Sequence, residues 1–266
     1  MLEPFELLHE SDGPRYEIPD ELSRIYGPLG FGTKALYANF VTSLDGVATL
    51  GSTPSAGSVL SGRYPADRFV MGLLRACADA VLLGAGTLRA TPNHLWTAGH
   101  VCPDYAPSFV ALRKLLGRRP DPRLVVVTAS GNLDVDHRAI VAGATVVTTA
   151  RGAHALRSRL PASCDLVVVG DGDDVDLTQV MRQMRERGHD VVLTEGGPHL
   201  VGELVDRNLL EEVFLTISPV LAGRDVEPRL GMIAGTELLP GRGVWTRLAG
   251  ARRHGDYLFL RYGLRG

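Results

Sequence analysis

The strongest candidate site in the sequence is a Glu-Gly-Gly turn between an apolar run and a helical pattern. Residues Val191 to Val201 read VVLTEGGPHLV, so a buried strand is expected to end at Thr194 and a helix to begin near Pro198. Two adjacent glycines let backbone N–H groups approach a ligand without a Cβ atom in the way. The N-terminus of the helix offers unpaired N–H donors and partial positive charge, which suit a diphosphate. The same residues would also serve as an ordinary strand-to-helix turn.

A second glycine-containing turn has the same form. Ala78 to Leu88 read ADAVLLGAGTL, in which a buried strand leads into a turn and then to the hydroxyl of Thr87. In a parallel sheet both turns lie at the carboxyl ends of strands, where α/β proteins bind their ligands. Two such turns at one sheet edge could hold both halves of a dinucleotide.

A third segment places a carboxylate after a strand. Asn39 to Thr49 read NFVTSLDGVAT, and Ser43 to Gly46 form a turn sequence. Asp45 is therefore either a turn-forming residue or a carboxylate at the mouth of the same cleft. The local sequence favours the turn.

Several better-known motifs fail. Gly27 to Lys34 read GPLGFGTK, but a phosphate-binding P-loop needs Gly-Lys-Ser/Thr followed by a helix. In Gly84 to Arg89, the arginine takes the place of the third glycine of a dinucleotide fingerprint. The nucleobase-deaminase signature is absent. The eight histidines are scattered, so no metal site and no deaminase activity are predicted.

The elements that must position these turns are predicted from short apolar runs and helical patterns. Nearly continuous apolar runs are typical of strands buried on both faces, and their alternation with helices indicates an α/β fold. We expect a mostly parallel mixed sheet of about eight strands with helices on both faces, ending in a hairpin over Trp245–Tyr262. Residues 1–34 are expected to form an arm with a short helix near Pro19–Tyr26, and residues 35–266 one domain. Thr91–Ser108 and Gly117–Arg123 are expected to be surface loops. The expected strands are Ala35–Val41, Ala80–Gly84, Leu124–Thr128, Ala144–Thr148, Asp165–Val169, Asp190–Thr194, Glu212–Ile217 and Asp256–Tyr262, and the expected helices Tyr64–Ala78, Asp176–Arg187 and Pro198–Asn208.

Composition excludes some partners. The 266 residues are 45% hydrophobic and 22% charged, as in ordinary globular proteins. A net charge of −2 gives no reason to expect nucleic acid or an anionic membrane as partner. No apolar run reaches the length of a membrane span, and the acidic N-terminus does not have the pattern of a secretory signal. The three separated cysteines favour reduced thiols in a cytoplasmic protein.

Taken together, the segments resemble the reductase domain of riboflavin biosynthesis, a family related to dihydrofolate reductase. The matching segments occur in the family's order across about residues 35–262. The stand-alone pyrimidine-reductase-like proteins of actinobacteria are the most similar members. The matches are Ser43–Gly46, Leu74–Ala76, Ala78–Thr87, Glu195–Gly197 and Ile217–Gly223.

The resemblance implies a dihydrofolate-reductase-like fold, a homodimer, and an NADPH-dependent reduction of 5-amino-6-(5-phosphoribosylamino)uracil. In that reaction a hydride passes from the nicotinamide to the C1′ carbon of the ribosylamino group. The resemblance implies Asp45 and Glu195 as catalytic residues, and substrate contacts from Ser58, Ser61, Arg75 and Glu195. It implies that NADPH contacts Thr42, Gly84, Gly86, Thr87, Thr91, Ser130, Gly170, Gly172, Gly196, Gly197, Pro198, His199 and Leu200.

One segment departs from the family pattern. Leu88 to Trp96 read LRATPNHLW, which lacks an aspartate and the arginine that helps to hold the ribose phosphate. Phosphate needs positive partners. A dihydrofolate-type pteridine reductase is therefore the alternative enzyme, and a non-catalytic nucleotide-binding protein the alternative outside enzymes.

Overall fold

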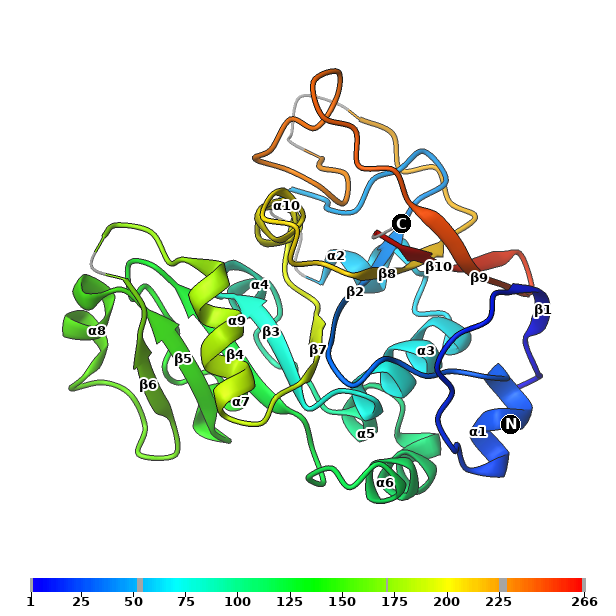
Figure 1. Ribbon diagram of the computed structural model, residues 1–266, viewed down its shortest axis with the longest axis horizontal. Helices are drawn as coiled ribbons and strands as arrows, with labels where there is room; N and C mark the ends of the chain where they lie inside the picture. Colours follow the sequence, from blue (N-terminus) through cyan, green and yellow to red (C-terminus); the bar gives the residue numbers. More distant parts are fainter. Residues whose placement is uncertain (1, 52–54, 171, 225–228, 265–266) are drawn as a thin grey trace.

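A single mixed sheet of ten strands runs through the molecule (Figure 1). The computed structural model describes residues 2–51, 55–170, 172–224 and 229–264. The strand order is β1-β9-β10-β8-β2-β7-β3-β4-β5-β6. The predicted α/β class with a mostly parallel mixed sheet is confirmed, but the predicted number of about eight strands is too small.

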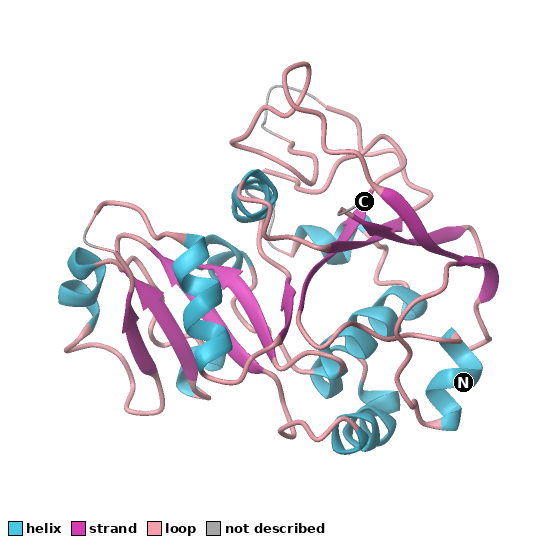
Figure 2. Ribbon diagram, in the orientation of Figure 1, coloured by secondary structure: helices cyan, strands magenta, loops and turns pink. Residues whose placement is uncertain are grey.

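The strands are β1 (Glu6–Glu10), β2 (Ala35–Thr42), β3 (Ala80–Gly84), β4 (Arg123–Thr128), β5 (Ala144–Thr148), β6 (Asp165–Val168), β7 (Val191–Thr194), β8 (Glu212–Ile217), β9 (Arg247–His254) and β10 (Tyr257–Gly263). The helices are α1 (Asp20–Tyr26), α2 (Ala56–Leu60), α3 (Pro65–Ala76), α4 (Ala85–Ala90), α5 (Ala98–Val101), the 3-10 helix η1 (Pro103–Tyr105), α6 (Ala106–Leu115), α7 (Arg138–Val141), α8 (Ala150–Leu156), α9 (Leu177–Glu186) and α10 (Pro198–Asp206). Figure 2 shows how they alternate with the strands.

Seven neighbouring strands, from β8 to β6, pair in parallel. The remaining three, β1, β9 and β10, pair antiparallel at the other edge. β9 and β10 form the predicted terminal hairpin. Because the central strands are parallel, the carboxyl ends of β2, β7, β3 and β4 share one edge of the sheet, and the glycine turns lie there.

Successive side chains of the central strands enter two separate cores, which explains their nearly continuous apolar sequences. In β3, Val81 and Leu83 join the core that contains α3 and α6, whereas Leu82 joins the core that contains α9 and α10. Both faces of the sheet are therefore covered by helices, as predicted.

The N-terminal arm is part of this sheet. Its short helix is confirmed as α1, and residues 6–10 add an edge strand that pairs with β9. The segment 91–108, expected to be a surface loop, instead carries α5 and η1 and buries Trp96, Val101 and Tyr105. Among the helices of the described residues, none is long and apolar enough to cross a membrane.

Candidate functional site

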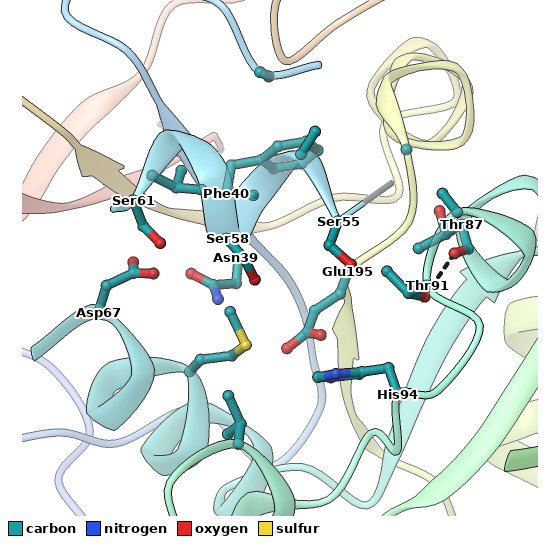
Figure 3. Close-up of a pocket in the computed structure, with 18 of the residues that line it drawn as sticks. Asn39, Phe40, Ser55, Ser58, Ser61, Asp67, Thr87, Thr91, His94 and Glu195 are labelled. Carbon is teal, nitrogen blue, oxygen red and sulfur yellow. Dashed lines mark hydrogen bonds between the residues drawn. The ribbon is translucent and has the colours of Figure 1, made fainter. Parts of the chain in front are cut away.

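A pocket of about 370 Å³ opens at the carboxyl ends of β2, β7 and β3. β2 supplies Asn39 and Phe40, α2 and α3 form one wall, and the two glycine turns form the opposite end. In Figure 3, Ser61 and Asp67 lie at one end, Thr87 and Thr91 at the other, and Glu195 and His94 between them. Segments far apart in the sequence therefore meet in one cavity.

Nine of the residues predicted for the site line this pocket. They come from α2 and its C-terminus, from α3, from the α4 turn, and from the Glu-Gly-Gly turn. They are Ser58, Ser61, Arg75, Thr87, Thr91, Glu195, Gly196, Gly197 and Pro198. Their roles in binding stay predictions.

The other predicted residues lie outside the lining. Gly84 is the last residue of β3, and Ser130 and Gly170 follow β4 and β6, so they lie along the edge over which an extended dinucleotide could continue. Between Gly170 and Gly172, residue 171 is outside the described part of the chain. The predicted site residues that do not line the pocket are Thr42, Asp45, Gly84, Gly86, Ser130, Gly170, Gly172, His199 and Leu200.

The Glu-Gly-Gly turn has different reasons for its two glycines. A Cβ at Gly196 would lie 2.4 Å from a methyl carbon of Leu200, so the turn packs directly on that side chain. A Cβ at Gly197 would lie 3.7 Å from the hydroxyl of Thr87, in the gap between the two glycine turns. Gly197 thus leaves open the space where a ligand would meet both turns.

Arg75 and Glu195 form the strongest polar contact of the pocket. Arg75 donates from Nε to Glu195 Oε1 at 2.9 Å and from Nη2 to Oε2 at 2.6 Å. Its Nη1 donates to the carbonyls of Leu95 and Thr97, and its Nη2 also lies 2.8 Å from His94 Nε2. A guanidinium has five N–H donors, and these five contacts occupy all of them.

Arg75 therefore has no free N–H donor for an anionic group of the substrate, although its side chain lines the pocket. The Arg75 side chain is 1% exposed. At the C-terminus of α3, its backbone carbonyl accepts a hydrogen bond from the buried Arg113 of α6. The geometry gives Arg75 a positioning role: it neutralises Glu195 and fixes the direction of its carboxylate. The predicted role as a substrate anchor does not fit this arrangement.

Asp45 is placed away from the pocket. Its carboxylate accepts the backbone N–H groups of Ala222 at 3.0 Å and Gly223 at 2.9 Å, and the hydroxyl of Ser43 at 2.6 Å. The Ser43 hydroxyl and these backbone groups lower the pKa of Asp45 to about 2. Asp45 thus ties the loop after β8 to the turn after β2 and stays ionised near neutral pH. The structure does not bring Asp45 and Arg75 together across one cleft.

Asp67 is a pocket residue that sequence reasoning did not assign. It lies in the first turn of α3, is 5% exposed, and lines the pocket near Ser61 (Figure 3). Burial raises its pKa from 3.8 to about 6, against the lowering effect of the Thr216 and Ser61 hydroxyls, and the charge of Glu195 raises it further. A carboxylate on the helical face shared with Val70 and Leu74 was the available signal.

His94 and its aromatic neighbours form the third wall. The His94 ring packs edge-on against Trp96 and His100, with centroids 5.0 and 4.9 Å away. Burial, helped by the adjacent Arg75 charge, lowers the pKa of His94 to about 3, so the ring is neutral. Its Nε2 then accepts from Arg75, which leaves the proton on Nδ1. This wall is formed by the segment that departs from the family pattern.

Comparison with known proteins gives a consistent result. The family described as RibD C-terminal domain matches residues 34–239. A 2,5-diamino-6-ribosylamino-4(3H)-pyrimidinone 5′-phosphate reductase of Archaeoglobus fulgidus is 26% identical over 192 residues, which cover 71% of this chain and 83% of that protein.

Two solved structures share the fold. A pyrimidine reductase-like protein of Corynebacterium diphtheriae superposes with a TM-score of 0.68 at 19% identity, over 92% of this chain and 98% of that one. RibD of Acinetobacter baumannii superposes with a TM-score of 0.62 at 17% identity, over 87% of this chain and 58% of that one. The present chain therefore spans little more than half of the Acinetobacter protein.

Proposed function

We propose, because the chain belongs to the RibD C-terminal domain family, that its pocket reduces a ribosylamino-pyrimidine 5′-phosphate with a hydride from a reduced nicotinamide. The observation that carries this proposal is the continuity of the pocket. The Gly197–Thr87 gap opens into the chamber that Asp67 and Glu195 line. The name of the Archaeoglobus relative supports the pyrimidine class. That name specifies a diaminopyrimidinone, whereas the resemblance in sequence suggested the related uracil.

The residues at the glycine turns fit such a cofactor. Gly197 keeps the gap beside Thr87 free of a side chain. The first N–H groups of α10 have no acceptor within the helix, and they are suited to phosphate oxygens. His199 and Leu200 would act through these backbone groups, since the His199 side chain is exposed and Leu200 packs under Gly196.

NADPH rather than NADH is the proposed cofactor, with Arg89 as the residue that supports this choice. Arg89 Nη1 donates to the carbonyl of Asn132 at 3.0 Å, and Asn132 N–H donates to Ser130 Oγ. The guanidinium of α4 therefore lies over the loop after β4. Residues 128–132 of that loop read TASGN and contain no arginine or lysine. Arg89 would therefore be the positive partner of a 2′-phosphate.

When bound, the reduced nicotinamide supplies the hydride, and the protein must align the acceptor and exclude water. Reduction of an imine C=N bond adds that hydride to carbon and a proton to nitrogen. Asp67, whose pKa is about 6, is a buried carboxyl group that can hold this proton near neutral pH. Glu195, fixed by Arg75, is able to accept hydrogen bonds from ring N–H groups.

A dihydrofolate-type pteridine reductase is the second candidate, and two observations favour it. Arg75 has no free N–H for a phosphate, and Asp67 is a buried carboxyl group that lines the pocket. Such a group suits protonation of a pteridine nitrogen.

NADPH oxidation by purified protein, followed by absorbance, tests both candidates. The pyrimidine 5′-phosphate, the same compound without phosphate, and dihydrofolate would be compared. Turnover of the phosphorylated pyrimidine alone supports the first proposal, and turnover of dihydrofolate alone supports the second. NADPH binding without oxidation of any of the three would indicate a non-catalytic nucleotide-binding protein.

We propose a cytoplasmic homodimer as the working form. Leu221 and Trp245 are exposed on the chain between β8 and β9, and Leu44 is exposed on the turn that bonds to Val220. The hydrogen bond from Leu44 N to Val220 O brings the exposed Leu44, Val220 and Leu221 together, and such exposed apolar clusters are typical of subunit contacts. Size-exclusion chromatography with light scattering would test this assembly.

A further inference from the structure

A second cavity adjoins the pocket on the side remote from the glycine turns. This outer cavity has a volume of about 780 Å³ and lies between α3, α5 and the N-terminal segment. Arg63, Arg68 and Val101 line both cavities. Arg63 and Arg68 therefore lie at the junction between the inner pocket and the outer cavity.

Both arginines have donors to spare. Arg68 donates from Nε to the carbonyl of Val101 at 2.8 Å, which orients its guanidinium and leaves Nη1 and Nη2 free of that contact. The backbone N–H of Arg63 donates to the carbonyl of Ser58, which holds the residue at the junction. Among the ion pairs formed by the described residues, neither arginine takes part.

Acidic groups near the junction are otherwise engaged or more distant. Glu21 lines the outer cavity, but its carboxylate accepts the hydroxyl of Ser108. Asp104 lines the outer cavity without an ion pair to either arginine. Asp67 feels the charge of Arg68 and bonds to hydroxyl groups on its other side. The two guanidinium groups thus keep their positive charge toward the cavities.

We propose that Arg63 and Arg68 bind the anionic tail of the substrate, a phosphate or a carboxylate. This inference rests on the proposed function of the inner pocket. Arg75 cannot take this role, because its five donors are occupied. Arg68 precedes Arg75 by seven residues on α3, about 10 Å along the helix axis. The ring therefore lies between Glu195 and the glycine turns, and the tail extends past Asp67 to the junction.

The first test is kinetic. Arg63→Ala, Arg68→Ala and the double variant are compared with the wild type on the phosphorylated pyrimidine and its dephosphorylated form. Charge-assisted hydrogen bonds predict a KM raised roughly tenfold or more for the phosphorylated form in the double variant. The KM for the dephosphorylated form and the fluorescence-measured affinity for NADPH should stay within about twofold. Arg182→Ala, on the exposed face of α9, is the matched control and should change neither value.

Dihydrofolate and a dihydropterin without the glutamate tail give the second arm. If the arginines matter only for dihydrofolate, the anion is a carboxylate; if only for the pyrimidine, it is a phosphate. Equal loss on tailed and tailless substrates, or no loss on either, would overturn the anion site.

A binding measurement keeps this inference separate from the proposed function. Should no substrate be reduced, the proposed function fails, yet titration of ribose 5-phosphate against ribose still tests the junction. Saturable binding of ribose 5-phosphate that is lost in the double variant but kept in Arg182→Ala would support the anion site. Equal binding to the wild type and the double variant would refute it.

Discussion

Replacing Asp67 with asparagine tests the assignment of Asp67 as the proton-holding group of the pocket. Burial raises the pKa of this carboxyl from 3.8 to about 6. Each pKa unit corresponds to about 1.4 kcal/mol, so ionised Asp67 should destabilise the folded protein by roughly 3 kcal/mol relative to its protonated form. Protonated Asp67 therefore stabilises the fold relative to ionised Asp67. This contribution is fully present below pH 3.8 and is lost as the pH rises through about 6. Asparagine has nearly the same shape and does not titrate.

Urea unfolding of the wild type and Asp67→Asn between pH 4 and pH 8 measures this difference. The free energy of unfolding of Asp67→Asn should increase by about 3 kcal/mol relative to that of the wild type as the pH rises, because only the wild type must bury a charge. Asp45→Asn is the control. The pKa of Asp45 is lowered to about 2, so its stabilising contribution is complete above 3.8 and is lost only as the pH falls toward 2. The Asp45→Asn difference should therefore stay flat between pH 4 and pH 8.

The same variant separates a catalytic role from a structural one. If Asp67 delivers the proton, kcat/KM of the wild type should fall above about pH 6, where the carboxyl loses its proton. Asp67→Asn should have a low turnover that does not fall further above pH 6. Its affinity for NADPH should be unchanged. A stability difference that does not vary with pH, or a variant with the wild-type pH–rate profile, would refute the assignment.

Three further predictions concern the cofactor and the ion pair. Gly197→Val should weaken NADPH binding about tenfold or more in a fluorescence titration, since the new side chain enters the gap beside Thr87; its φ of −69° suits any residue, and Gly241→Ala, in open space, should have no effect. Arg75→Ala should lower the free energy of unfolding by about 3 kcal/mol in urea, because it leaves Glu195, whose side chain is 10% exposed, as an unpaired carboxylate, and adding Glu195→Gln should restore part of that loss. Arg89→Ala should weaken NADPH binding about tenfold and leave NADH binding unchanged. Equal weakening of both would show that Arg89 does not recognise the 2′-phosphate.

Much of the fold could be predicted from sequence because the central strands carry their own signal. LVVVT and DVVLT are apolar on both sides, and β4 and β7 are covered on both faces. The edge strand β1 carries no comparable signal. Its sequence ELLHE leaves Leu7 and Leu8 half exposed, and its partner β9 lies some 240 residues further along the chain. Pairing over such a distance depends on the completed sheet, which local patterns do not describe.

The candidate site was predictable where it depends on backbone and not where it depends on side-chain partners. The glycine turns could be identified because glycine at a strand end has a local conformational meaning. Asp67 lies in the first turn of α3, where aspartate is favoured for reasons unrelated to catalysis. The burial that raises its pKa to about 6 exists only in the folded protein, and the helix's own sequence does not show it.

Arg75 illustrates how a residue in a matched motif can have partners that its own segment does not reveal. The arginine at the end of α3 is kept, but His94, Leu95 and Thr97 now occupy the donors that Glu195 leaves free. His94 and Leu95 belong to the segment that departs from the family pattern, and Thr97 follows directly after it. Arg63 and Arg68 line the same pocket and are the arginines proposed to bind an anionic tail of the substrate. Because the glycine turns lie remote from the junction, substitutions at the junction should alter substrate preference while cofactor binding persists.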